Sequence, residues 1–299
     1  MSGENMINTL KMELKKALVS KYFIIGLSVM LLFAVLSGIY MIESRAGYNP
    51  DDIYEYCYSN GEFTENPDTS LFGFYNSWVG GEELSLAYTL FFQLLPLGAA
   101  LPFAWSFYRE RKTGYIKNIT SRVKKEYYYY SKAIAVFLSG SLVVLVPLLV
   151  NILLVSAFVP VVRPFVGYTH YNHLYFGNMW ADIYYTTPML YTALYVILES
   201  LYGGIFALLS FAITFYINNI FAVEILPFIL MIAFGYLQGF IYNLIGTATV
   251  QFEFVPTYFI HSRTLGGQVV SWVVISVTLL LIAFSLVTIL VRGKRDEIF

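Results

Sequence analysis

The chain has 299 residues, of which 58% are hydrophobic, 18% aromatic and only 12% charged, with a net charge of −1. Soluble domains carry roughly 25% charged residues, so this composition excludes a water-soluble enzyme, a disordered chain and a nucleic-acid-binding protein. The mean hydropathy of +0.65 favours a polytopic membrane protein instead. The single cysteine, Cys57, excludes an intrachain disulfide.

Six apolar stretches are long enough to cross a bilayer, since a spanning helix needs about 20 apolar residues. Ahead of them, residues 6–20 repeat an apolar residue every four positions, which predicts an interfacial helix in the plane of the inner leaflet. We therefore expect an all-α integral membrane protein with one transmembrane domain over residues 1–299. The predicted spans are Tyr22–Ile42, Leu84–Phe107, Ser131–Val159, Pro188–Tyr216, Ile220–Ile245 and Val270–Val291.

The distribution of basic residues predicts the orientation. With the N-terminus inside, the three inside segments hold four, eight and three of the 18 basic residues. Acidic residues are biased the other way, and nine of the 19 lie between Glu43 and Glu83. An even number of spans then places both termini in the cytoplasm.

Three external loops carry information. Residues 43–83 form a long acidic loop, whose charge either attracts cationic substrates or follows from keeping positive charge inside. His170 and His173 lie among tyrosines that indicate an aromatic belt at the interface, so we expect no metal site there. Residues 246–269 are apolar yet broken by polar residues, which predicts short helices that dip into the outer leaflet before the last span.

The internal loop at 109–127 is basic but contains a short apolar pattern. Tyr115, Ile116 and Ile119 are spaced so that a helix places them on one face, with Lys112 and Lys117 turned away. Such an amphipathic helix either lies on the bilayer or docks into a groove on a partner protein.

This architecture resembles the ABC transporter permeases of the type-2 exporter class. The family motif in the corresponding loop is matched here by Glu110, Gly114, Tyr115-Ile116 with Ile119, Ser121-Arg122 and Lys132. The form Gly-Tyr-Ile-Lys-Asn-Ile at 114–119 is similar to permeases of the bacitracin- and lantibiotic-resistance branch in Gram-positive bacteria. One departure is the order Thr113-Gly114, where many relatives read Gly-Thr.

The resemblance implies that the loop contains a coupling helix, which docks on an ATP-binding subunit. It also implies that two permeases, either two copies or one copy and a homologue, assemble with two such subunits in the bacterial plasma membrane. The chain has no phosphate-binding G-x-x-x-x-G-K-[ST] motif, so ATP and Mg²⁺ would be held by the partner and this chain would be no enzyme. The substrate would be an antimicrobial or cationic peptide. The residues expected to contact the ATPase are Glu110, Arg111, Lys112, Gly114, Tyr115, Ile116, Ile119 and Arg122.

Glu199 lies 11 residues after Pro188 and therefore about 16 Å into its span, near the bilayer midplane. A carboxyl group there is costly and should face the interior of the bundle. Tyr191, Tyr195 and Tyr202 share its helix face. This polar stripe either lines the substrate route, with Glu199 meeting a cation or proton, or holds the helices in register.

Gly235 and Gly239 form a GxxxG motif in the fifth span, which indicates either a contact with a second permease copy or packing within one bundle. Two other classes of function compete with the permease. A stand-alone channel or carrier would not need a docking helix. A membrane enzyme would need catalytic histidines within spans, whereas all three histidines fall in predicted external loops.

Overall fold

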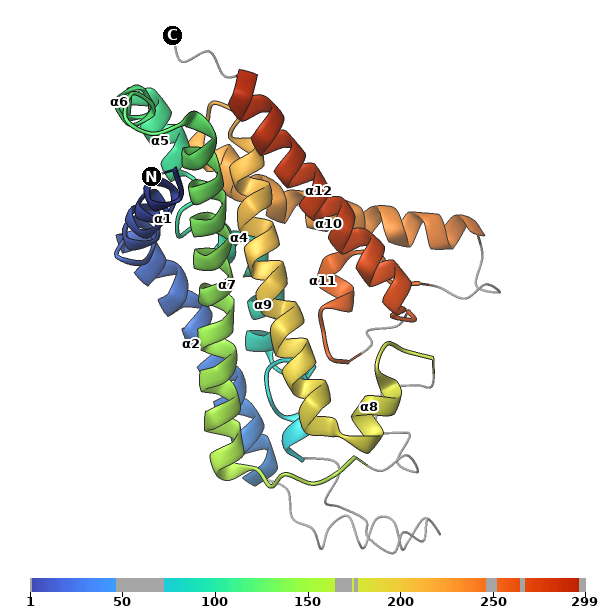
Figure 1. The fold of residues 1–299 in the computed structure, drawn as a ribbon. Coiled ribbons are helices and arrows are strands. Elements are labelled where there is room, and N and C mark those ends of the chain that lie inside the picture. Colours follow the sequence, from blue (N-terminus) through green and yellow to red (C-terminus); the bar gives the residue numbers. More distant parts are fainter. Residues whose placement is uncertain are drawn as a thin grey trace, which may run out of the picture.

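The protein is a bundle of helices (Figure 1), described in a computed structural model over residues 2–46, 73–164, 174, 177–245, 252–263 and 267–295. Within these residues the only β-structure is an isolated bridge between Phe252 and Gln268. The helices are α1 Ser2–Leu18, α2 Lys21–Ala46, η1 Phe74–Asn76, α4 Leu86–Ala100, α5 Ser106–Lys112, α6 Tyr115–Thr120, α7 Lys125–Phe158, α8 Ala181–Thr186, α9 Pro188–Ile213, α10 Ile220–Ile245, α11 Pro256–Phe259 and α12 Ser271–Arg295.

Five of the helices, α2, α7, α9, α10 and α12, are long and apolar enough to cross a membrane. The most apolar stretch of α9 is 89% buried inside the protein, whereas those of α2, α10 and α12 are only 22–28% buried. Apolar side chains that the protein itself does not cover are stable in lipid rather than in water. The chain is therefore a multi-pass, all-α membrane protein.

The predicted second span, Leu84–Phe107, is divided in the structure. α4 has 15 residues, which at 1.5 Å per residue cover about 22 Å, less than the roughly 30 Å of a hydrocarbon core. The chain then turns through residues 101–105 before α5 begins. Pro102 lies in this turn, and its carbonyl accepts a hydrogen bond of 3.0 Å from Ser20 at the α1–α2 corner. The six-span count therefore stays a prediction.

The other predicted elements lie close to where the sequence placed them. The helix predicted at 6–20 overlaps α1, which ends at Leu18, and the span predicted at Ile220–Ile245 has the same bounds as α10. In the predicted external loop at 246–269, α11 is the one helix within the described residues. Most of the acidic loop, residues 47–72, lies outside the described residues.

The two ends of the bundle differ. α1, α5, α6 and the last turns of α12 gather at one end, and η1 and α8 lie at the opposite end (Figure 1). α10 crosses the bundle at a steep angle to α9 (Figure 1). Because α1, α5 and α6 lie at the same end, the basic loop at 109–127 is beside the N-terminal helix, which is far from it in the sequence.

α7 and α9 form the centre of the bundle and run antiparallel (Figure 1). Two glycines let their backbones approach closely. A Cβ atom added to Gly140 would lie 2.8 Å from the carbonyl oxygen of Gly203, and one added to Gly203 would lie 2.9 Å from the carbonyl oxygen of Gly140. Small residues permit such contacts in membranes, where helix association depends on close packing.

We expect Gly203→Ala to destabilise the protein by about 1–3 kcal/mol, because the added methyl group meets backbone that cannot move aside. Gly239→Ala is the matched control, since an added Cβ there has no atom within 4 Å. Thermal unfolding in detergent micelles measures both variants. Equal midpoints for the two would contradict the close approach of α7 and α9.

Candidate functional site

The basic internal loop forms two short helices joined at a glycine. Thr113 ends α5, and Gly114 follows in the left-handed region with φ +71°. Glycine adopts this conformation without steric cost, so it both terminates α5 and lets the chain turn into α6. The sequence Thr113-Gly114 therefore sets the angle between the two halves of the loop.

The apolar face predicted for docking turns largely toward this chain. Ile116 is only 2% exposed and packs in a core cluster with Phe103, Phe107 and Tyr128, while Ile119 packs partly buried against the same cluster. Exposed basic residues surround it, including Lys112 and Arg122. Tyr115 and Ile119 thus remain the accessible apolar members of the predicted docking face, and Ile116 anchors α6 to the bundle.

A buried cluster of charges connects this loop to the rest of the protein. Lys132 of α7 donates hydrogen bonds of 2.9 Å to Glu13 of α1 and of 2.9 Å to Glu110 of α5. Lys16 of α1 bonds Glu13 at 2.8 Å and the hydroxyl of Tyr115 in α6 at 2.7 Å. We name these five residues the charge cluster. Side chains from α1, α5, α6 and α7 meet there.

The charge cluster is balanced and well satisfied. The side chains of Glu13 and Lys132 are both fully buried, and Tyr128 of α7 donates a further hydrogen bond to Glu110. The ammonium group of Lys132 also lies 3.9 Å from the centre of the Phe103 ring. Buried charges are tolerated when each has an opposite charge and hydrogen bonds, so the four helices are held in one arrangement.

The charge of Lys16 is also stabilised by its neighbours. Burial lowers the pKa of Lys16, but its hydrogen bonds to Glu13 and Tyr115 and the nearby carboxylate of Glu110 together raise that pKa above its ordinary value. Lys16 therefore stays protonated throughout the physiological range. Two cations and two anions then face one another in the charge cluster.

A groove lies beside the charge cluster, between α1 and α6. It has a volume of about 510 Å³ and is lined by Thr9 and Met12 of α1 and by Tyr115, Ile119 and Arg122 of the loop. Three of these residues belong to the predicted ATPase contact. The groove therefore has a mixed lining, in which the apolar Met12, Ile119 and Val123 lie among polar side chains and the cation Arg122.

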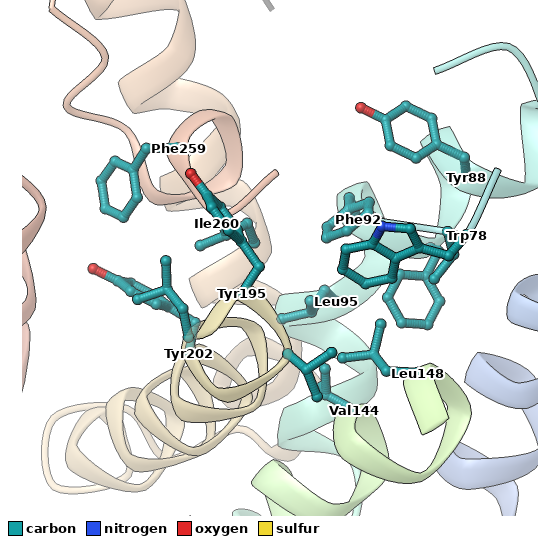
Figure 2. Close-up of a cluster of buried hydrophobic side chains, with 14 of the residues drawn as sticks. Trp78, Tyr88, Phe92, Leu95, Val144, Leu148, Tyr195, Tyr202, Phe259 and Ile260 are labelled. Atoms are coloured by element: carbon teal, nitrogen blue, oxygen red, sulfur yellow. The ribbon is translucent and has the colours of Figure 1, made fainter. Parts of the chain in front are cut away.

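A larger cavity, which we call the outer pocket, lies between α4, α10 and the segment around α11. Its volume is about 970 Å³, and its walls include Tyr88 and Phe92 of α4 and Tyr258 and His261 near α11. Figure 2 shows Tyr88 and Phe92 on the α4 side of the aromatic core. This volume lies within the range of about 300–1,000 Å³ that is typical of small-molecule sites.

The polar stripe predicted around Glu199 is buried, as expected, and its tyrosine side chains contact other parts of the protein. Tyr191 donates a hydrogen bond to the Ser262 carbonyl, and Tyr202 lies 2.7 Å from the hydroxyl of Thr278. Tyr195 packs edge-on against Trp180, and Figure 2 shows it pointing toward Ile260. These tyrosines fasten α9 to its neighbours.

Glu199 itself differs from its tyrosine neighbours. The residue is fully buried, and neither carboxylate oxygen has a hydrogen-bond partner among the described residues. The alternative role predicted for Glu199 was to hold the helices in register. The described residues show no hydrogen bond through which it would do so. Glu224 of α10 is the second buried glutamate whose side-chain oxygens lack a partner in the described chain.

The glycines of the GxxxG motif have different surroundings. A Cβ on Gly235 would lie 2.6 Å from the hydroxyl oxygen of Tyr258, whereas Gly239 faces open space. Both line the outer pocket. Gly235 therefore permits a close contact with Tyr258 within the chain. The contact of the GxxxG motif with a second copy stays a prediction.

Among the described residues, no three potential metal ligands gather. His170 and His173 lie outside the described residues. Searches found no match for the chain among protein-family models, curated proteins or solved structures.

Two parts of these sites were not predicted from the sequence. Glu13 is an acid within a basic helix, and pairing it with Lys132 requires knowing that α1 packs against α7. Tyr88 and His261, whose side chains lie 3.1 Å apart, are 173 positions apart in the chain. The sequence signal for the charge cluster was Lys132 itself, a cation just inside an apolar span.

Lys132→Met should destabilise the protein by about 3–5 kcal/mol, because it leaves the carboxylates of Glu13 and Glu110 facing each other in a buried site. Lys117→Met, at an exposed position of α6, is the control and should change stability by less than about 0.5 kcal/mol. Denaturant unfolding measures both. A small effect of Lys132→Met would show that the cluster does not hold the helices together.

His261 predicts a dependence of stability on pH. Burial lowers the pKa of His261 to about 3 despite a hydrogen bond to the Thr257 backbone, whereas an unfolded histidine titrates near 6.5. The unfolded chain therefore binds the extra proton first, and stability is lost as pH falls below the unfolded pKa. Between about pH 7 and pH 5 the loss should be about 2 kcal/mol.

His261→Gln should reduce this acid sensitivity, measured as the change in the thermal midpoint between the two pH values. Thr257→Ala, which keeps the imidazole and its backbone hydrogen bond, is the control and should retain it. An unchanged pH dependence in His261→Gln would assign the acid sensitivity to another group.

Proposed function

We propose that this chain is the membrane-spanning subunit of an ATP-driven exporter of the ABC type, working with a separate ATPase. The charge cluster is the single observation that carries the proposal. It joins the internal loop, through Glu110 and Tyr115, to α7 and α1. A force applied to α5 and α6 from outside the membrane would therefore be passed to the central helix pair.

The resemblance stated from the sequence supports the same proposal. Glu110 and Lys132 are two separate positions of the family motif, 22 residues apart, and they bond each other at 2.9 Å. A bond between these two charges has a physical purpose if the loop must move as one body with α7. Because the second span is divided near Pro102, α5 and α6 form a short unit of their own. This unit contacts α7.

The groove between α1 and α6 is the seat we propose for the ATPase. The apolar residues of this groove and the exposed cations Lys112 and Arg122 would complement a partner surface that has an apolar ridge and an acidic rim. ATP and Mg²⁺ would bind to that partner. Two copies of the permease, or one copy and a homologue, would then assemble with two ATPase subunits in the bacterial plasma membrane, with both termini cytoplasmic.

The outer pocket gives the exporter a ligand site. It is separated from the loop by the core of the bundle, so a substrate there would be acted on through the helices. A stand-alone carrier would need such a pocket too, but it would not need the groove or the charge cluster. An antimicrobial or other cationic peptide is the substrate class that the resemblance and the acidic external loop favour.

The test is the ATPase activity of the protein purified with its partner from native membranes. Arg122→Glu combined with Ile119→Asp should abolish co-purifying ATP hydrolysis, because both residues line the groove and neither belongs to the charge cluster. Arg292→Glu makes the same charge reversal at the end of α12, outside the groove, and should retain the activity.

Loss of ATP hydrolysis in the groove variant alone would support the proposal. Wild-type protein that purifies without any ATPase, and that transports without ATP in vesicles, would overturn it in favour of a carrier. Retention of full activity in the groove variant would move the partner contact elsewhere.

A further inference from the structure

The N-terminal helix α1 has a face that the charge cluster does not use. At about 100° per residue, Ile7, Lys11, Lys15 and Leu18 fall within roughly a quarter of the helix circumference. All four are exposed. Glu13, which is fully buried in the charge cluster, lies on the opposite side of the same helix. We name the four exposed residues the outward face of α1.

An aromatic and basic corner follows this face directly in the chain. Tyr22, at the start of α2, packs edge-on against Trp105 with ring centres 4.5 Å apart. The guanidinium group of Arg109 lies 5.9 Å from the centre of the Trp105 ring. Lys21 precedes Tyr22, and both Lys21 and Arg109 are exposed. We name Lys21, Tyr22, Trp105 and Arg109 the corner.

The four cations of these two surfaces have no acidic partner within the described chain. The carboxylates of the charge cluster are already paired with Lys16 and Lys132. Glu224 of α10 approaches the backbone of Trp105, but it is only 8% exposed. The two surfaces therefore carry an excess of positive charge that the surrounding residues do not neutralise.

The surroundings of the corner favour lipid as the partner. α2 begins there and is long and apolar enough to cross a membrane, yet its most apolar stretch is only 28% buried. Ile24 and Ile25, just after the corner, are 58% and 50% exposed. A helix that mixes exposed cations with apolar side chains lies in the membrane interface, and tryptophan and tyrosine gather at the same depth. A protein covering the corner would have to displace lipid from α2.

The charge of these surfaces selects the class of lipid. A basic residue beside an anionic leaflet gains about fivefold in affinity, whereas a zwitterionic headgroup carries no net charge to attract it. Lys11, Lys15, Lys21 and Arg109 act on the same leaflet, because α1 and the corner adjoin in the chain. The contact with Trp105 also restrains the Arg109 side chain, so less freedom is lost when a phosphate binds.

We propose that the outward face of α1 and the corner bind anionic phospholipid headgroups, and that this contact holds α1 in place on the charge cluster. α1 supplies Glu13 and Lys16 to that cluster, so a lipid that fixes one face of the helix supports the other. The inference rests on the proposed exporter only for the use of this support in coupling. Lipid binding itself needs neither ATP nor a partner protein.

The test measures tryptophan fluorescence of the full-length protein in phosphatidylcholine vesicles that contain a minor fraction of brominated lipid. The brominated lipid is either phosphatidylglycerol or phosphatidylcholine with the same chains. The quenching that Trp105→Phe removes belongs to the corner. Phosphatidylglycerol should quench Trp105 about twofold or more as strongly as phosphatidylcholine. This preference should vanish near 1 M salt, where the Debye length is about 3 Å.

Lys21→Gln combined with Arg109→Gln should reduce the quenching of Trp105 by phosphatidylglycerol to the level given by phosphatidylcholine, because the attracting charges are gone. Lys117→Gln combined with Arg292→Gln is the matched control. It also removes one exposed lysine and one exposed arginine, outside both surfaces, and should keep the preference. Size-exclusion profiles verify that both variants are folded.

The support of the charge cluster is measured by thermal unfolding in a non-ionic detergent. Phosphatidylglycerol should raise the thermal midpoint of the wild type by about 3 °C or more, since it binds the folded protein. Lys11→Gln combined with Lys15→Gln should lose this gain. The control pair should retain it.

Equal quenching by the two lipids in the wild type would overturn the inference and leave the two surfaces to an acidic partner protein. A preference lost equally in the corner variant and the control would overturn the assignment to the corner. A midpoint gain that survives in the α1 variant would overturn the link to the charge cluster. None of these measurements involves the ATPase, so a failure here and a failure of the exporter proposal are distinguishable.

Discussion

The bond between Lys132 and its two carboxylate partners is the interaction on which the internal end of the protein depends. Lys132 lies at the start of the apolar part of α7, where an unpaired cation would be strongly destabilising. Carboxylate oxygens of Glu13 and Glu110 each lie 2.9 Å from Nζ of Lys132 and neutralise its charge. Glu13 is 119 positions from Lys132 in the sequence, and Glu110 is 22 positions from it. Satisfying one charge therefore fixes the positions of α1 and α5 against α7.

The rest of the bundle is held by contacts of another kind. At the centre, Gly140 and Gly203 bring the backbones of α7 and α9 together, and no charge takes part. Toward the opposite end, Asn151 of α7 donates to the Ala34 carbonyl at 2.7 Å and accepts from the backbone of Val79 at 2.8 Å. Both polar groups of the Asn151 side chain are thus hydrogen-bonded, as a membrane interior favours.

The sequence predicted the helices well because their signals are local. A long apolar run predicts α10 without any knowledge of its neighbours. Glu199 was also predicted correctly to be buried, since an acid at that depth has few alternatives. The division of the second span was missed because Pro102 is compatible with a kinked helix as well as with a break.

What the sequence could not supply is which distant residues meet. Glu13 and Glu199 are both buried acids, yet Glu13 has two cations beside it, whereas Glu199 has none among the residues that the structure describes. That difference decides what each can do. A paired carboxylate holds helices in place and resists change, whereas an unpaired one is stable only while a proton or cation neutralises it. The paired carboxylate therefore suits the internal end of the protein, which the proposed exporter must move as one body.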